Sequence, residues 1–531
     1  MQNKFSFYIL LMALVSLGSC AKKGTISGGA KDEIPPRLIS ASPVQNATNF
    51  KAKEIKIYFD EYIKLKDLNK NLIISPPLKY KPLISPMGTA SKYIKIKIRD
   101  TLKANTTYIF NFGQSVVDNN EGNVYPNFSY VFSTGNVIDS LSFKGTVQDV
   151  LAVKDPKNIT VMLYEMGENY TDSIVYKEKP NYLTNTFEGN SFMFHNLKAG
   201  KYRLVAITDL NNNQKYNPKT EQLAFESQPI ILPDTTAHTL KLFKAVLPFK
   251  SLRAKQESKG KILFPFEGDS TAIALKPVSQ SKVVSFVQKI AAKDSLLYWY
   301  KNYDKDSLIL ALKKGNYIKK HTVKLRRKRQ DSVLVHFAFR GSLALDKKIR
   351  ITSETPLAKI ATDKIIVLDK DSTTVAFKPL IVANKDAFLL DFKAKEQESY
   401  TVTILPSAIT DFFGQANKDT LTSSFKTKKI IDYGSLKITL ENQKTAVFIE
   451  LLDSKSKLIQ SHYLSKNTAT TTFSLLKPQT YMVRLRLDTN GNKKWDTGNI
   501  IKQQQPEKVV YLPKPLEVRA NWDLEEKFVL K

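Results

Sequence analysis

Two short loops carry the side chains best suited to hold an ion. Aspartate or asparagine stands at loop positions one, three, five and nine, in the sets Asp209, Asn211, Asn213, Asn217 and Asp488, Asn490, Asn492, Asp496. Alternate oxygen-bearing side chains on a tight loop can converge on a hard cation, so the spacing predicts calcium. The sixth position lacks the usual glycine (Gln214, Lys493) and the twelfth lacks the usual glutamate (Thr220, Asn499), which predicts weak affinity. The alternative is a hairpin loop whose side chains cap their own backbone.

A second candidate is the densest run of positive charge, residues 319–329. On a strand, Val323 and Leu325 would face inward and their basic neighbours outward. The residues that could contact a polyanion are Lys324, Arg326, Arg327, Lys328 and Arg329. The alternative is a charged edge that prevents strand-to-strand aggregation.

Aromatic and histidine residues offer weaker signals. Residues 298–300 (Tyr-Trp-Tyr) either stack on a sugar ring or belong to a core. The five histidines show no zinc-type spacing, and the sequence has neither a phosphate-binding glycine loop nor a nucleophile elbow. No catalytic residue is predicted, which argues against an enzyme.

The single cysteine of the chain, Cys20, follows an apolar run that begins near Phe5 and is too short to span a bilayer. Gly18 and Ser19 before it are small enough for a peptidase pocket. The segment resembles a bacterial lipoprotein signal, which implies that residues 1–19 are removed and that Cys20 takes a lipid such as palmitate. The alternative is a plain secretory leader with an incidental cysteine. With one thiol, the chain can form no intramolecular disulfide.

The charge of the chain limits the classes of partner that we expect. Its formal net charge is +31, and only 12 of its 81 basic residues are arginine. Lysine-rich charge favours attraction to anionic envelope surfaces, such as head-group phosphates or acidic polysaccharide. An exported protein seldom meets nucleic acid, so no nucleic-acid partner is expected. Bacteroidetes-type lipoproteins, which this chain resembles, often carry acids after the cysteine when they reach the cell surface. Lys22 and Lys23 stand there instead, which favours an outer-membrane lipoprotein on the periplasmic side.

Alternating apolar and polar residues after residue 53 predict half-buried strands, as in Ile55, Ile57 and Phe59 with Lys56 and Tyr58 between them. Residues 33–136 resemble the bacterial Ig-like domain family first described in S-layer proteins. The resemblance is carried by Pro35-Pro36, Ser42-Pro43, Phe59-Asp-Glu61 and Phe132-Ser-Thr-Gly135. Such domains are mostly adhesion, spacer or display modules, so the resemblance implies a structural role without catalytic residues.

The same order of motifs returns later in the chain. Residues 341–430 repeat the Ig-like pattern in a divergent form, without the opening prolines. Residues 137–247 and 431–531 resemble prealbumin or Cna-B-type sandwiches. The resemblance is carried by the run from Phe192 to Leu204 and by its counterpart from Phe473 to Val483. An earlier strand, Val161–Tyr164, is matched to Val447–Glu450. Residues 20–32 are expected to be a flexible tether. Residues 248–340 read as a β-rich middle domain with one helix near Gln288 to Tyr300.

Together these patterns predict an all-β protein of tandem antiparallel β-sandwiches, Ig-like and then prealbumin-like, duplicated. The expected function is that of a non-enzymatic, lipid-anchored cell-envelope protein. It would act as a spacer or interaction scaffold, attached to the membrane through its lipid and in contact with envelope proteins or anionic glycans. The alternative is a protein that binds envelope polysaccharide or lipopolysaccharide.

Overall fold

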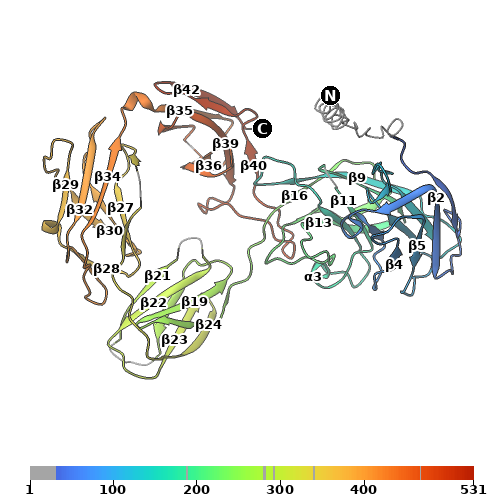
Figure 1. The fold of residues 1–531 in the computed structure, drawn as a ribbon, viewed down its shortest axis with the longest axis horizontal. Coiled ribbons are helices and arrows are strands. Elements are labelled where there is room, and N and C mark those ends of the chain that lie inside the picture. The colour runs from blue at the N-terminus through green and yellow to red at the C-terminus, as the bar shows by residue number, and fades with distance from the viewer. Residues whose placement is uncertain are drawn as a thin grey trace, which may run out of the picture. The chain divides into compact units, whose positions relative to one another are not determined.

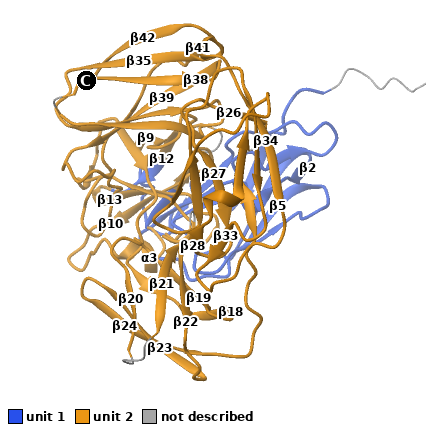
Figure 2. Ribbon diagram, turned by 90° about the vertical axis from the view of Figure 1, so that its left-hand side faces the viewer, with its two compact units in different colours: residues 1–141, 181–183, 195–198 blue, residues 142–180, 184–194, 199–531 orange. Residues whose placement is uncertain are grey.

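A computed structural model describes residues 32–186, 189–278, 283–290, 293–338, 341–466 and 468–530. Nearly all regular structure in these residues is β-strand, arranged in antiparallel sheets with a few parallel pairs, so the all-β prediction is confirmed (Figure 1). None of the helices in the described ranges is long and apolar enough to cross a membrane. The chain divides into two compact units, mainly residues 1–141 and mainly residues 142–531 (Figure 2).

Unit 1 is built around an Ig-like sandwich. One sheet has the order β1-β2-β5-β4, with β7 also paired to β2, and the other has the order β3-β6-β8. The bounds are β1 (Leu38–Ser42), β2 (Glu54–Leu65), β3 (Ile73–Ser75), β4 (Leu83–Ser85), β5 (Ser91–Lys97), β6 (Thr107–Asn111), β7 (Val116–Asp118) and β8 (Ser129–Ser133), with a short helix α2 (Leu68–Asn71). The alternation predicted from Ile55 to Phe59 is confirmed, because these apolar residues are buried in the core between the sheets.

Residues 141–243 form a second type of sandwich. Its sheets have the orders β11-β10-β13-β14, with β15 also on β13, and β12-β9-β16, in which β16 runs parallel to β9. The bounds are β9 (Leu141–Asp149), β10 (Thr160–Glu165), β11 (Tyr182–Asn185), β12 (Ser191–Leu197), β13 (Gly200–Ile207), β14 (Leu223–Phe225), β15 (Ile230–Leu232) and β16 (His238–Leu242), with a short helix α3 (Ile174–Lys177).

The last sandwich, residues 434–529, repeats this topology strand for strand. Its sheets have the orders β37-β36-β39-β40, with β41 also on β39, and β38-β35-β42, again with a parallel pair at the end. The bounds are β35 (Gly434–Glu441), β36 (Ala446–Leu452), β37 (Leu458–Leu464), β38 (Thr470–Leu476), β39 (Gln479–Asp488), β40 (Val509–Tyr511), β41 (Leu516–Val518) and β42 (Asp523–Val529). The predicted duplication is therefore present in the fold.

The register corrects one detail of the predicted match. Val161 pairs with Ala206, and Ala206 lies three residues before Asp209, which opens the first loop. The residue at that place in the second copy, Leu485, pairs with Ile449 and not with Val447. The match is therefore shifted by two residues, a shift that the sequence pattern hides because strand side chains alternate with a period of two.

In its described residues the middle domain holds eight strands in two sheets, ordered β17-β19-β22-β21, with β18 also on β19, and β20-β23-β24. The bounds are β17 (Lys250–Ser251), β18 (Lys255–Ser258), β19 (Lys261–Glu267), β20 (Ala274–Pro277), β21 (Val284–Lys289), β22 (Ser295–Lys301), β23 (Ser307–Lys314) and β24 (Tyr317–Lys324). The predicted helix between Gln288 and Tyr300 is wrong: this stretch is the hairpin of β21 and β22, in which Gln288 pairs with Leu297.

The next sandwich, residues 335–427, is called the second Ig-like sandwich after the resemblance drawn from the sequence, and it repeats the strand order of unit 1 with one added strand. Its sheets are β25-β27-β31-β30, β26-β34-β32-β29 and the pair β28-β33, and η1 (Thr362–Lys364) and η2 (Ile430–Asp432) are short 3-10 turns. The bounds are β25 (Val335–Phe337), β26 (Gly341–Leu343), β27 (Ile349–Ser353), β28 (Leu357–Ile360), β29 (Ile365–Leu368), β30 (Lys378–Ile381), β31 (Ala387–Asp391), β32 (Ser399–Ile404), β33 (Ile409–Asp411) and β34 (Leu421–Thr427). Its first strand, β25, precedes the predicted start at 341 and pairs with β27.

Candidate anion-binding site

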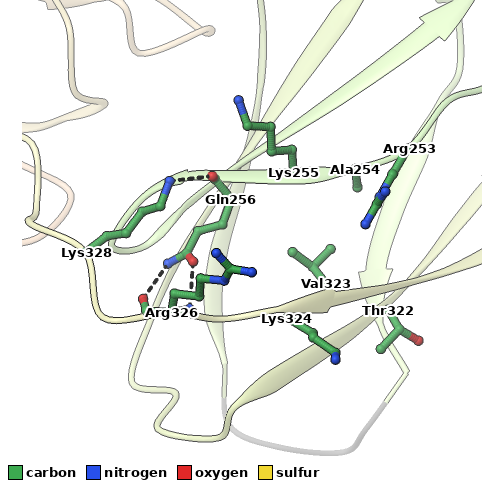
Figure 3. A pocket seen from close by; sticks show the side chains of 9 residues that line it. All are labelled: Arg253, Ala254, Lys255, Gln256, Thr322, Val323, Lys324, Arg326 and Lys328. Atoms are coloured by element: carbon green, nitrogen blue, oxygen red, sulfur yellow. Dashed lines mark hydrogen bonds between the residues drawn. The ribbon is translucent and has the colours of Figure 1, made fainter.

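The middle domain contains a groove between β18 and β24, on the segment where the sequence predicts a polyanion contact. Its cavity measures about 660 Å³. The lining residues are Arg253, Ala254, Lys255, Gln256, Thr322, Val323, Lys324, Arg326 and Lys328 (Figure 3). Five of these nine are cationic and none is acidic, so the groove is a concentrated positive surface.

Strand alternation produces the floor of the groove. On β24, Val323 is 4% exposed and belongs to the core of the middle domain, whereas Thr322 and Lys324 on either side are exposed. The predicted inward position of Val323 is confirmed. The same alternation that buries the apolar side chain therefore puts a cation and a hydroxyl at the rim.

A single glutamine ties the two sides of the groove together. The buried Gln256 of β18 donates from Nε2 to the carbonyl of Arg326 (3.2 Å), and its Oε1 accepts the N–H of Arg326 (2.8 Å). Lys328 Nζ donates to the carbonyls of Gln256 and Glu257, both at 3.0 Å. These bonds hold the chain after β24 against β18, so the backbone that carries Arg326 is fixed even though its side chain is exposed.

The cations of the groove differ in how they are neutralised. Lys255 pairs with Glu257 at 3.4 Å, and Lys328 is engaged by carbonyls. No hydrogen bond or ion pair joins the side chains of Arg253, Lys324 or Arg326 to another residue in the described ranges. The guanidinium groups of Arg253 and Arg326 extend toward the space around Val323 from opposite sides, whereas Lys255 and Lys324 point away from it (Figure 3).

A buried histidine, His321, lies on β24 next to Thr322 and outside the lining of the groove. Burial, reinforced by Lys319 nearby, lowers the pKa of His321 below its ordinary value. Its Nε2 lies 2.9 Å from Ser251 Oγ, which is also 3.1 Å from the hydroxyl of Tyr317. No carboxylate joins this serine and histidine in the described part of the chain, so the network connects β17 to β24 and lacks the acid of a catalytic triad.

One other cluster brings a hydroxyl, a histidine and acids together. His238 Nε2 lies 2.6 Å from Thr236 Oγ1 and 3.1 Å from Asp234, and its Nδ1 lies 3.3 Å from Glu226. Both ring nitrogens therefore face a carboxylate. A general base needs one nitrogen free to take the proton of the nucleophile. This arrangement is a hydrogen-bond network in which neither ring nitrogen is free, and not an activated nucleophile.

The structure divides the predicted polyanion residues into two groups. Lys324, Arg326 and Lys328 line the groove, and Arg327 and Arg329 do not. Two lining cations, Arg253 and Lys255, were missed because they precede the basic run by more than 60 residues, and only the fold brings the two segments together. The three aromatic residues at 298–300 are buried, which places them in the interior and not on a sugar-binding surface.

The two Asp/Asn loops share one pattern of hydrogen bonds. The carboxylate of Asp209 accepts the N–H groups of Asn213 (3.1 Å) and Gln214 (2.8 Å). In the second copy, Asp488 accepts those of Asn492 (3.1 Å) and Lys493 (2.9 Å). Within the described residues, no group of three or more His, Cys, Asp or Glu side chains is arranged to hold a metal ion. The side chains cap the loop backbone, as in the alternative interpretation.

The calcium prediction remains to be tested, and a thermal melt tests it. A weak site saturated at ten times its Kd stabilises the folded sandwich by about 1.4 kcal/mol. If the loops bind calcium, millimolar calcium should raise the melting temperature of wild-type protein and should have no such effect on the Asp209→Asn, Asp488→Asn double variant. Magnesium at the same concentration is the control for ionic strength. Melting curves that coincide with and without calcium would remove the cation from these loops.

Comparisons with known proteins place one part of the chain in a family. No curated protein matches this chain. Among solved structures, a chimeric titin Z1Z2 is 13% identical over 35% of this chain and 97% of its own, with a TM-score of 0.16. The S-layer protein rSbsC is 12% identical, and the match covers 91% of this chain and 67% of rSbsC, with a TM-score of 0.14. A third structure is SGBP-B of the Bacteroides ovatus mixed-linkage glucan utilization locus, solved in complex with a mixed-linkage heptasaccharide. It is 11% identical, and the match covers 72% of this chain and 94% of SGBP-B, with a TM-score of 0.17.

Scores this low carry no inference about ligands or partners. The family comparison is specific: residues 32–134 match the bacterial Ig-like domain. This match agrees with the resemblance drawn from residues 33–136 and with the sandwich of β1 to β8. The chain therefore contains a bacterial Ig-like domain at residues 32–134.

Proposed function

We propose that the protein is a non-enzymatic, lipid-anchored scaffold of the cell envelope, tethered to the outer membrane and facing the periplasm. The observation that carries the scaffold role is the junction between the middle domain and the second Ig-like sandwich, both within unit 2. Neighbouring domains in one chain move freely by default, unless a packed interface holds them. A spacer that holds its domains at a fixed distance needs such an interface.

The junction is held by hydrogen bonds with paired geometry. The side chain of Asn384 donates to the carbonyl of Lys289 and accepts the N–H of Lys289, both at 2.9 Å. Gln288 Nε2 donates to the carbonyl of Asn384 at 3.2 Å. Asn384 thus extends the edge strand β21 as a short piece of backbone would, which fixes one register between the two domains.

Aromatic packing forms the other half of the junction. The ring of Trp299 meets that of Phe413 edge to face, with centroids 6.0 Å apart. Lys301 Nζ donates to the carbonyl of Phe412 at 2.8 Å. Gly260 has φ +79°, and a Cβ there would lie 2.6 Å from the Phe413 ring, so the approach requires glycine. This combination of shape and polar contacts supports a rigid junction.

The anchor part of the proposal rests on Cys20, which lies outside the described residues. Replacing it should abolish lipid attachment, because only this thiol can accept the lipid. We expect wild-type protein to incorporate radiolabelled palmitate and to sediment with membranes. The Cys20→Ala variant should lose the label completely and move to the soluble fraction.

The matched control for the anchor is Ser19→Ala, which keeps a small residue before the cleavage point and should keep the label. Absence of label on the wild-type chain, or label on Cys20→Ala, would contradict the anchor. The scaffold role is tested separately, through the junction.

A further inference from the structure

We infer that the groove between β18 and β24 binds an acidic polysaccharide, whose oxyanion groups are held by Arg253 and Arg326. The inference deepens the proposed function by naming the class of envelope molecule that the scaffold holds, and it rests on that function only for the compartment where the ligand is met. It stands on four observations: the charge of the groove, the two arginines, its fixed backbone and the lack of aromatic side chains in its lining.

The charge of the groove calls for an anionic partner. Cations gathered in a hollow repel one another, and the field between low-dielectric walls is focused rather than dispersed. Ordinary surfaces intersperse both signs, yet this lining has five cations and no acid. Arg253, Lys324 and Arg326 carry no counter-ion among the described residues. A ligand with several negative groups would relieve this repulsion, and a neutral ligand would not.

The two arginines give the groove its specificity. A guanidinium presents a planar fork that pairs with carboxylate or phosphate through two parallel hydrogen bonds, which an ammonium cannot do. Arg253 lies before β18 and Arg326 after β24, and their forks approach the same space from opposite sides (Figure 3). They can therefore hold one oxyanion between them or two successive ones along a chain.

The groove is organised before any ligand binds. Gln256 uses both ends of its amide to hold the backbone of Arg326, and Lys328 fastens the same loop to β18. A ligand then needs to order only the ends of exposed side chains, which lowers the entropic cost of binding. A solvated basic loop without these bonds would have to be ordered entirely by its ligand.

The lining favours an acidic glycan over a neutral sugar or a membrane. Neutral sugars are held by stacking on aromatic faces, and none of the nine lining residues is aromatic. A peripheral membrane surface presents exposed apolar side chains for insertion, whereas Val323 is buried in the floor. A hollow of about 660 Å³ also has the size of a small-ligand pocket and not the flatness of a bilayer contact.

The test measures binding by the chain from residue 20 with Cys20→Ser, by isothermal titration calorimetry at physiological salt. The probes are phosphomannan and polygalacturonate, which carry phosphate and carboxylate respectively, with dextran as the neutral control. We expect saturable binding to at least one acidic polymer and none to dextran. The polymer that binds more tightly identifies which oxyanion the groove prefers.

Arginine variants then locate the site. Each of Arg253→Ala and Arg326→Ala should weaken binding roughly 10-fold and the double variant roughly 100-fold, as expected for lost charge-assisted hydrogen bonds. The double variant Arg253→Lys, Arg326→Lys keeps the charge and loses the guanidinium forks. Its affinity should therefore fall between that of wild-type protein and that of the double alanine variant. The matched control is Arg327→Ala, Arg329→Ala, which removes the same amount of charge from the loop of Arg326 but outside the groove, and it should change Kd by less than about 3-fold.

Three outcomes would overturn the inference. Equal losses in the groove and control double variants would show that net charge alone attracts the polymer. Binding of dextran as tightly as the acidic polymers would show a neutral sugar site. Binding to phosphatidylglycerol vesicles without binding to either acidic polymer would show a membrane surface. Because the test chain carries no lipid, failure of the anchor cannot produce any of these results.

Discussion

Replacing Trp299 by alanine should destabilise the middle domain by about 3–5 kcal/mol, the range found when a buried aromatic is truncated in a core. Trp299 is 0% exposed, although it lies between Tyr298 and Tyr300, which are also buried. Three consecutive buried residues on a strand mean that both of its faces are covered. Tyr298 and Tyr300 belong to the core of the middle domain, and Trp299 faces the other way, toward Phe413.

The loss of the Trp299 side chain should also weaken the junction with the second Ig-like sandwich. Its Nε1 donates to Gln288 Oε1 at 2.9 Å, and the same glutamine donates to the carbonyl of Asn384 in the next domain. Truncation leaves the buried Gln288 oxygen without its donor, a further cost. We expect amides of β21, β22 and β33 to exchange faster together in hydrogen-exchange mass spectrometry, since local opening reports the stability of each segment.

Two variants control this prediction. Trp522 is 55% exposed, so Trp522→Ala should cost less than about 1 kcal/mol and leave β21 and β22 unchanged. Trp299→Phe keeps apolar bulk and loses the N–H, so its effect should be intermediate. If Trp299→Ala perturbs exchange no more than Trp522→Ala does, the junction is not packed as described and the scaffold role loses its support.

The same tryptophan shows where sequence patterns succeed and where they fail. Ile55, Ile57 and Phe59 alternate with polar residues because one face of β2 meets solvent, so their strand was predictable. On β22 the second face is covered by another domain, and the alternation disappears. A stretch buried on both sides has no period of two, which is why the sequence pattern predicts a helix where the structure pairs β21 with β22.

The candidate site was predictable in part, for a related reason. Lys324, Arg326 and Lys328 belong to one visible basic run. Arg253 and Lys255 join them only because β18 and the chain after β24 are brought side by side, through Gln256. Nothing in the local sequence around residue 253 signals this long-range contact. The duplication, by contrast, was visible because each copy repeats a whole order of motifs, although the register shift of two residues was not.

Glu450→Ala should destabilise the last sandwich by about 3–5 kcal/mol, because it leaves two arginines partly buried without their counter-ion. Glu450 is 0% exposed on β36 and accepts from Arg484 at 2.7 Å and from Arg486, both on β39. Glu450 and Arg484 are cross-strand partners, so the sheet itself holds the ion pair in place. The expected result is faster exchange of the β36 and β39 amides and a lower calorimetric transition for this sandwich.

An exposed pair in the same sandwich gives the matched control. Glu517 and Arg519 form an ion pair with both side chains more than half exposed, so solvent screens the pair and Glu517→Ala should leave the stability of the sandwich nearly unchanged. Glu450→Gln keeps the shape and an acceptor oxygen but removes the charge, so it should fall between the two alanine variants. A Glu450→Ala cost no larger than that of Glu517→Ala would mean that water reaches the arginines when the acid is removed. Glu450 alternates along β36 with the core residues Ile449 and Leu451, so the ion pair lies on the outer face of this sheet. The order of the three variants therefore measures how well solvent is excluded from that outer face.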